Sequence, residues 1–203
     1  MTIYKTLLGT DFDKLHPKLQ KRYSIPVGKP FFASGTMTKI ESGASWLKPF
    51  LQLATRWQFL FPETGRNVPF TVKNTCRTLP TGEAEIYWER TFYFEKVTRH
   101  FNAFMTIDPK RRIVKDYLGE PSLFYSDLQF EVTPEGHQVI RSGRQRFILG
   151  PLEIPIPKML EGVVTVEDGY DDAREVFTVQ VHIHNRIVGK VMVYEGEYKE
   201  ESL

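Results

Sequence analysis

The stretch from Glu85 to Glu95, EIYWERTFYFE, alternates strictly between two kinds of side chain. Every second residue, beginning with Ile86, is apolar or aromatic, except for Arg90 in the middle of the series. A repeat of two residues is typical of a β-strand with one buried face and one face in water. A buried guanidinium must be paired or hydrogen-bonded, because an unpaired buried charge costs several kcal/mol. The stretch therefore predicts a strand with a polar spot on its buried face, and it makes the partner of Arg90 the main functional question.

Length and composition favour one domain over residues 1–203, large enough to bury a core without disulfides or metals. Lys and Arg number 27 and Asp and Glu 25, so the net charge of +2 creates no large field that would attract nucleic acid or an anionic membrane. The single cysteine, Cys76, excludes an internal disulfide framework and a cysteine-based metal site. We see no secretory signal and no apolar run of about 20 residues, and we therefore predict a cytoplasmic protein without a transmembrane segment.

The chain before this strand predicts short helices followed by a strand. Residues 3–23 place leucines and Phe12 at helix-like spacings, and Pro17 interrupts the run. One or two short helices are therefore expected to lie on the core. Residues 31–40 are small or β-branched in many positions, which predicts a first strand, with a bend at Gly35.

The segment 45–61 changes to steps of three and four residues, as one face of a helix would. Its apolar residues at these steps are Trp46, Phe50, Leu53, Trp57 and Phe61. Aromatic stripes at helical spacing are usually buried, so we expect one helix that covers an open face of the sheet. The alternative is an aromatic lid, or a helix that rests in a membrane interface.

From Val68 onward the chain is expected to consist of strands and turns. Turn residues separate the apolar runs at 80–82, 108–109, 134–136, 168–172 and 185–186, and prolines between 150 and 157 predict a break. The fold class is therefore mainly β (α+β): a curved antiparallel sheet closing toward a barrel of roughly nine strands, with N-terminal helical segments and one covering helix. A barrel of this size has room for a small ligand.

Arg90 has two possible roles. In the last strand, alternation of the apolar residues between 187 and 193 places Glu195 on the inward face. One possibility is that Arg90 pairs inside the barrel with Glu195, Glu161 or Glu167. The other is that its planar fork binds a ligand carboxylate or phosphate at the floor of an apolar cavity.

The remaining candidate residues favour ordinary roles. His182 and His184 share one strand face, but a metal site needs further ligands, so we predict a solvated polar face and no metal. The basic runs 110–115 and 141–146 do not match a nucleic-acid module, so no nucleic-acid partner is predicted. The chain has no phosphate loop, dinucleotide fingerprint, nucleophile elbow or HExxH motif, which leaves no catalytic residue and no cofactor to assign.

Several short patterns, taken in order, resemble a known family. They are Leu15, His16 and Pro17; Trp88, Arg90 and Phe92; Gly150 followed by Ile154, Pro155, Ile156 and Pro157; and Ile187, Val188 and Gly189 leading to Tyr194 and Gly196. The chain resembles a bacterial domain-of-unknown-function family found as a stand-alone protein in bacilli and as a C-terminal domain behind saccharopine-dehydrogenase-like reductases. The resemblance implies no activity and no catalytic residue, and it suggests a reductase-like protein as a possible partner.

These observations lead to a main functional prediction and two alternatives. We predict a binding domain for a small amphipathic, anionic or lipid-like ligand. Its candidate ligand-binding residues are Arg90, Trp88, Phe92, Tyr194, Glu195 and Trp57. The first alternative is a protein-interaction or structural module with a filled barrel, and the second is an enzyme acting on a lipid-like or polyketide-like substrate. An ionisable group with a shifted pKa in a cavity would favour the enzyme.

Overall fold

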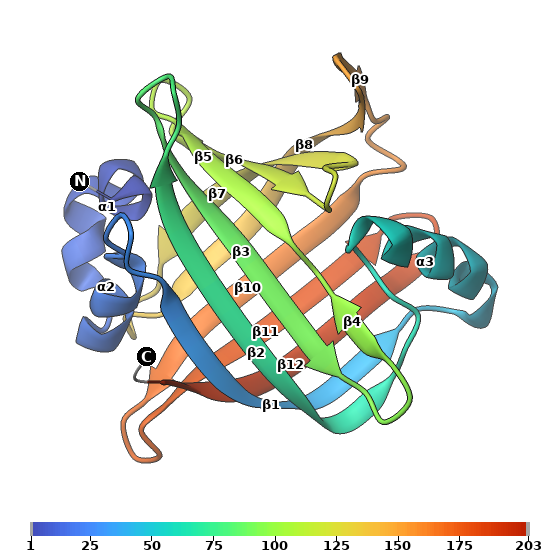
Figure 1. Cartoon of the computed structure of the whole chain (residues 1–203), viewed down its shortest axis with the longest axis horizontal. Coiled ribbons are helices and arrows are strands. Elements are labelled where there is room, and N and C mark those ends of the chain that lie inside the picture. Colours follow the sequence, from blue (N-terminus) through green and yellow to red (C-terminus); the bar gives the residue numbers. More distant parts are fainter. Residues whose placement is uncertain (1, 202–203) are drawn as a thin grey trace.

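The computed structural model describes residues 2–201, and its N-terminal helices lie together at one end of the molecule (Figure 1). They are α1 (Ile3–Leu8), the 3₁₀ helix η1 (Gly9–Lys14) and α2 (Pro17–Tyr23). The Thr2 side chain caps α1 by accepting a hydrogen bond from the Lys5 N–H. Pro17 lies in the first turn of α2, where a missing N–H costs least. The predicted short helices, with a break at Pro17, are confirmed.

A second helical region follows the first strand and differs from the prediction. It consists of η2 (Ser45–Leu47), α3 (Lys48–Ala54) and η3 (Thr55–Trp57). Gln58 then takes a left-handed backbone conformation with φ 48°, which ends the helix before Phe61. Trp46 and Phe50 are 56% and 65% exposed, so the expectation that the whole aromatic face packs on the sheet is wrong. Of the five residues of the predicted stripe, Phe61, which lies beyond the helix, is the only buried one in the described chain.

The strands make up most of the chain. The first six are β1 (Phe31–Ser42), β2 (Gly65–Thr78), β3 (Ala84–Tyr93), β4 (Thr98–His100), β5 (Ala103–Asp108) and β6 (Ile113–Leu118). The other six are β7 (Phe124–Val132), β8 (Gln138–Leu149), β9 (Leu152–Pro155), β10 (Gly162–Asp171), β11 (Val176–Asn185) and β12 (Gly189–Glu200). Within residues 2–201, no helix is long and apolar enough to cross a bilayer.

The strands form one antiparallel sheet that closes on itself. Its order is β10-β11-β12-β1-β2-β3-β5-β6-β7-β8-β9, and β10 also pairs with β8, from Thr165 opposite Arg141 to Asp168 opposite Gln138. All strands except β4 and β9 therefore form a closed ten-stranded barrel, whose strongly tilted strands are visible in Figure 1. The predicted closure is confirmed, with one more barrel strand than expected. The break predicted at the prolines contains β9, a short strand that pairs with β8.

Alternation along each strand separates the interior from the surface. In β2 the buried residues are Val68, Phe70, Val72, Asn74 and Cys76, every second position. In β11, Val181 and Ile183 are buried. His182 and His184, which were predicted to lie on a polar face, are exposed. The period of two read from the sequence is thus the period that builds the core.

The inward face of β12 differs from the prediction. The pairing with β11 shifts register between Ile183 and His184, so that Val191 has no directly opposed partner. A bulge of one residue exchanges the two faces of a strand. Tyr194 and Tyr198 are consequently buried, and Glu195, which we expected inside, belongs to the opposite, less buried face.

A tight crossing of β1 and β12 gives a first testable prediction. A Cβ atom on Gly35 would overlap the carbonyl oxygen of Glu197 and lie 2.5 Å from the Cα atom of Tyr198. We expect Gly35→Ala to lower the free energy of unfolding by about 1–3 kcal/mol, because two backbones would have to separate. Urea unfolding measures this, with Gly162→Ala as the control. The nearest atom to a Cβ on Gly162 is 3.8 Å away, so equal losses for both variants would contradict the prediction.

Candidate functional site

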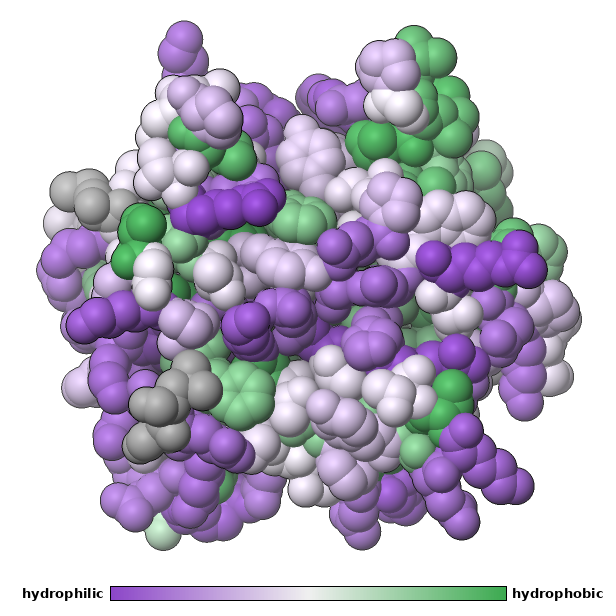
Figure 2. Space-filling model, viewed as in Figure 1, coloured by the Kyte–Doolittle hydropathy of each residue, from purple (hydrophilic) through white to green (hydrophobic). Residues whose placement is uncertain are grey.

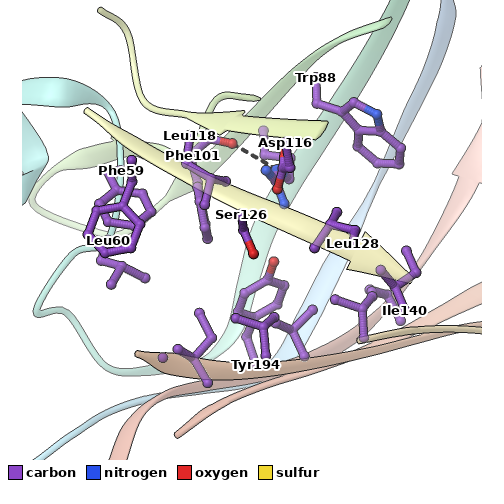
Figure 3. A pocket seen from close by; sticks show the side chains of 18 of the residues that line it. Phe59, Leu60, Trp88, Phe101, Asp116, Leu118, Ser126, Leu128, Ile140 and Tyr194 are labelled. Atoms are coloured by element: carbon purple, nitrogen blue, oxygen red, sulfur yellow. Dashed lines mark hydrogen bonds between the residues drawn. The ribbon is translucent and has the colours of Figure 1, made fainter. Parts of the chain in front are cut away.

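The interior of the barrel contains a pocket of about 360 Å³, lined by residues from α1, α2 and most of the strands. Aliphatic and aromatic side chains form most of its wall. Figure 3 shows Phe59 and Leu60 at one side of this pocket, Trp88 and Ile140 at the other, and Asp116 between them. The pocket is therefore an apolar space with a few polar groups inside it.

Arg90 lies on β3 and points into the pocket. Its Nε atom donates a hydrogen bond of 2.8 Å to the carbonyl oxygen of Phe101, and its guanidinium carbon lies 4.3 Å from the centre of the Phe101 ring. Its Nη2 atom is buried without a hydrogen-bond partner among residues 2–201. Two of the glutamates considered as partners are engaged elsewhere, since Glu167, whose side chain is 44% exposed, pairs with His137, and Glu161 accepts from the Gln145 N–H. The guanidinium of Arg90 thus has one nitrogen fixed by a hydrogen bond and one buried nitrogen without a partner in the described chain.

Asp116, on β6, is an acidic residue that lines the same pocket as Arg90. It is 5% exposed, and its Oδ1 atom has no hydrogen-bond partner within the described chain. Burial raises the pKa of Asp116 to about 7, although the positive charge of Arg90 opposes the rise. Burial likewise raises the pKa of Tyr194, again against the effect of Arg90. The pocket wall therefore contains both a guanidinium and a carboxyl group whose pKa lies near neutral pH.

A second arginine closes the end of the barrel that carries the N-terminal helices. Arg22 of α2 places its Nη1 atom 3.0 Å from Asp168 Oδ2 on β10, and the Tyr23 hydroxyl donates to the same oxygen. The side chains of Arg22 and Asp168 are 3% and 4% exposed. The guanidinium carbon also lies 5.2 Å from the centre of the Trp88 ring and 5.3 Å from that of Tyr198. This buried ion pair and its aromatic surround join the helices to the barrel.

The pocket wall carries an unusual number of polar atoms without partners. Buried polar atoms in folded proteins are nearly always hydrogen-bonded, so each exception needs an explanation. Within residues 2–201, the wall atoms that are buried and without a hydrogen-bond partner are Tyr4 OH, Arg22 Nε, Trp88 Nε1, Arg90 Nη2, Asp116 Oδ1 and Tyr198 OH. Five of these six groups can donate a hydrogen bond.

The structure separates the six residues that sequence reasoning proposed for a ligand site. Arg90, Trp88 and Tyr194 line the pocket. Phe92 lies beneath the wall, fully buried against Phe61 and Phe70, and contributes packing. Glu195 and Trp57 are absent from the lining, the first because of the β12 bulge; after η3 ends at Trp57, the next residues to reach the lining are Phe59 and Leu60.

Sequence reasoning missed Arg22, Asp116 and Asp168. The sequence signal for Asp116 was present, because it alternates with Val114 and Leu118 as Arg90 does with Trp88 and Phe92. Arg22 follows Leu19 at a helical step of three, on the face that the leucines bury. In both cases a charged residue in an apolar series was the available clue.

The charged clusters outside the barrel are largely neutralised by neighbours. Arg111 pairs with Asp127, Arg141 with Glu131 and Arg146 with Glu153. These pairs leave no uniform basic face, and the two whose partners are both partly exposed, Arg141 with Glu131 and Arg146 with Glu153, contribute about 0–1 kcal/mol each. Among residues 2–201, no group of three or more His, Cys, Asp and Glu side chains is arranged to hold a metal ion.

These features define the class of the protein: a closed, antiparallel ten-stranded β-barrel with a pocket inside and a helical cover at one end. The chain belongs to the family described as Domain of unknown function (DUF4166), whose model matches residues 15–198. It is 36% identical over 191 residues to the protein named Uncharacterized protein YndH of Bacillus subtilis (strain 168), covering 94% of this chain and 93% of that one. No solved structure gives a significant match.

Proposed function

We propose that this protein binds a small amphipathic ligand inside its barrel, with Arg90 holding the polar group of that ligand. The observation that carries the proposal is the set of unpartnered buried polar atoms in a pocket whose wall is otherwise apolar. Ligand sites are typically pockets of about 300–1,000 Å³ with mostly apolar walls and a few polar groups that fix orientation. At about 360 Å³, this pocket suits a compact guest. Its volume weighs against the alternative of a filled barrel.

The polar groups suggest what the guest carries. Trp88 Nε1 is only a donor, and its ring centre lies 5.8 Å from the guanidinium carbon of Arg90 and 5.2 Å from that of Arg22. A carboxylate, phosphate or carbonyl would satisfy these donors. Asp116, with a pKa near 7, can share its proton with a ligand carboxylate, which two permanently ionised groups could not do. The expected ligand therefore has an acidic group rich in hydrogen-bond acceptors and an apolar remainder.

The test is native mass spectrometry of gently purified protein, with denatured protein as the reference. We expect a non-covalent adduct on the wild type and its loss in Arg90→Leu, because the charge-assisted hydrogen bonds of Arg90 are worth about 1.5–3 kcal/mol, or roughly tenfold or more in affinity. Arg144→Leu, which removes an exposed arginine of β8, should keep the adduct. Circular dichroism checks that each variant is folded.

If no adduct survives purification, titration with anilinonaphthalene sulfonate, an anionic amphipathic dye, supplies a ligand of the expected chemistry. Equal dye affinity in wild type and Arg90→Leu would show that Arg90 is not the anchor. A wild type that takes up neither a purified guest nor the dye would refute the binding function itself.

The shifted pKa of Asp116 supports a second candidate function, that of an enzyme acting on a lipid-like substrate. A buried acid that ionises near pH 7 in a pocket is suited to proton transfer. If the protein is an enzyme, we expect the mass of the bound ligand to change during incubation with wild type but not with Asp116→Asn. A ligand whose mass is unchanged in both proteins would contradict the enzyme hypothesis and would support binding as the only function.

A further inference from the structure

The end of the barrel opposite the N-terminal helices is surrounded by exposed apolar side chains. We call these residues the mouth rim: Trp46, Phe50, Leu53, Met159, Leu160 and Ile187. Leu160 both lines the pocket and is exposed, so this is where the pocket meets the surface. In Figure 1 the helical region with α3 and the strand β9 stand at this end, on the right, and the N-terminal helices lie on the left. The molecule therefore has one end closed by helices and one end where the pocket meets exposed apolar side chains.

The mouth rim is held in place by specific contacts. Asn185, which is buried, donates through Nδ2 to the carbonyl oxygens of Met159 (3.1 Å) and Glu161 (2.9 Å). Its Oδ1 atom accepts from the N–H groups of Ile187 (2.8 Å) and Val188 (3.1 Å). One amide thus fixes two exposed apolar loops side by side at the mouth.

The third part of the mouth rim is attached to the same hairpin. The Gly43 N–H donates to the carbonyl oxygen of Val191 at 2.8 Å, which brings the start of the helical region next to β12. A Cβ atom on Gly43 would also lie 2.8 Å from the Leu47 side chain, so this approach is close. Trp46, Phe50 and Leu53 follow directly in η2 and α3 and remain exposed. A group of exposed apolar side chains rimmed by polar residues is a typical sign of an interaction site.

The charges around the mouth rim point to one kind of partner. The three segments that carry it, 44–58, 156–160 and 186–190, contain Lys48, Arg56, Lys158, Arg186 and Lys190 and no acidic residue. All five basic residues are exposed, and only Lys190 forms an ion pair within the described chain, with Glu41. Apolar side chains flanked by basic ones match an anionic bilayer surface, where the former enter the headgroup boundary and the latter contact phosphates.

We infer that the mouth rim docks on the surface of an anionic lipid bilayer, so that the pocket opens toward the membrane. Figure 2 shows hydrophobic residues also gathered at the upper right, where Figure 1 places β9. The exposed Leu152 and Ile154 of β9 extend the apolar surface beyond the rim. Docking does not require an occupied pocket. Transfer of a ligand between the bilayer and the pocket would rest on the proposed binding function. Docking on the bilayer does not, and it can be tested separately.

The test is flotation of the purified full chain with vesicles of phosphatidylcholine, alone or mixed with phosphatidylglycerol. We expect binding to the mixed vesicles and at least about tenfold weaker binding to the neutral ones, since several basic residues contribute near the surface. Phe50→Ser with Ile187→Ser should reduce binding to mixed vesicles by about tenfold or more. Lys48→Glu with Arg56→Glu should reduce it to a similar extent.

The loop between α2 and β1, at the closed end, offers matched controls. Val27 and Lys29 are exposed there, and Val27→Ser and Lys29→Glu should leave vesicle binding unchanged. Wild type that floats with neither vesicle, or rim variants that bind like wild type, would overturn the proposal. A wild-type mass of twice the chain in light scattering, reduced to one chain in the rim variants, would assign the surface to a second copy instead. None of these results depends on whether an adduct is found in the pocket.

Discussion

Replacing Arg22 with leucine is expected to lower the free energy of unfolding by about 3 kcal/mol or more. The substitution leaves Asp168 buried without its cation, and breaking a buried ion pair from one side typically costs about 3–5 kcal/mol. The Tyr23 hydroxyl, which also donates to this carboxylate, can offset only part of the loss. Because α2 closes one end of the barrel through this pair, we also expect the N-terminal helices to become more accessible to protease.

The neighbouring residue supplies the control for Arg22. Lys21 lies in the same helix and pairs with Glu200 at 2.7 Å, but both side chains are exposed. Lys21→Leu should therefore change the free energy of unfolding by less than about 1 kcal/mol. Urea unfolding at neutral pH measures both variants. If Arg22→Leu proved as stable as Lys21→Leu, the closed end would not depend on the buried pair.

The second large effect is a dependence of stability on pH that comes from Asp116. Its pKa is raised from 3.8 to about 7 in the folded protein, so the folded state binds more protons than the unfolded state between these values. Stability contributed by this group is therefore full below about pH 4 and is lost as the pH rises through 7. With about 1.4 kcal/mol for each pKa unit, the ionised group at pH 8 costs about 4 kcal/mol relative to its protonated form.

Asp116→Asn removes this ionisation while keeping the shape of the side chain. We expect the variant to be more stable than wild type at pH 8, by up to about 4 kcal/mol, and nearly equal to it at pH 4. Urea unfolding of both proteins at the two pH values tests this. Asp127→Asn provides the contrast, because Asp127 is buried with Arg111 and Tyr125 as partners, and its loss should destabilise the protein at pH 8. An Asp116→Asn variant without a stability gain at pH 8 would contradict the pKa shift.

The candidate site was accessible to sequence reasoning where a local pattern reported it. Arg90 interrupts an alternating apolar series, and the structure places it in the pocket wall together with Trp88. Alternation fails where a strand contains a bulge, since one extra residue exchanges the faces. For this reason Tyr194 lies in the wall and Glu195 does not, although the pattern had assigned Glu195 to the interior.

The segment of residues 45–61 shows a different limit of prediction from sequence. Spacings of three and four residues correctly indicated helical turns, but burial does not follow from spacing. Gln58 ends the region in a left-handed conformation, so Phe61 turns into the core while Trp46 and Phe50 stay exposed. The exposed rings can be recognised as a surface only once the position of the barrel mouth is known.

By itself, the sequence determined the predominance of β-strands, their approximate limits, the short N-terminal helices and the presence of a charged residue in the core. All of these arise from interactions between residues close in the chain, which repeat with the period of a strand or a helix. Only the tertiary structure decided that β10 pairs with β8 to close the barrel, that Arg22 meets Asp168 across 146 residues, and that Asp116 and Arg90 line one pocket. These pairings join distant segments, and they depend on closure and register, which no local pattern specifies.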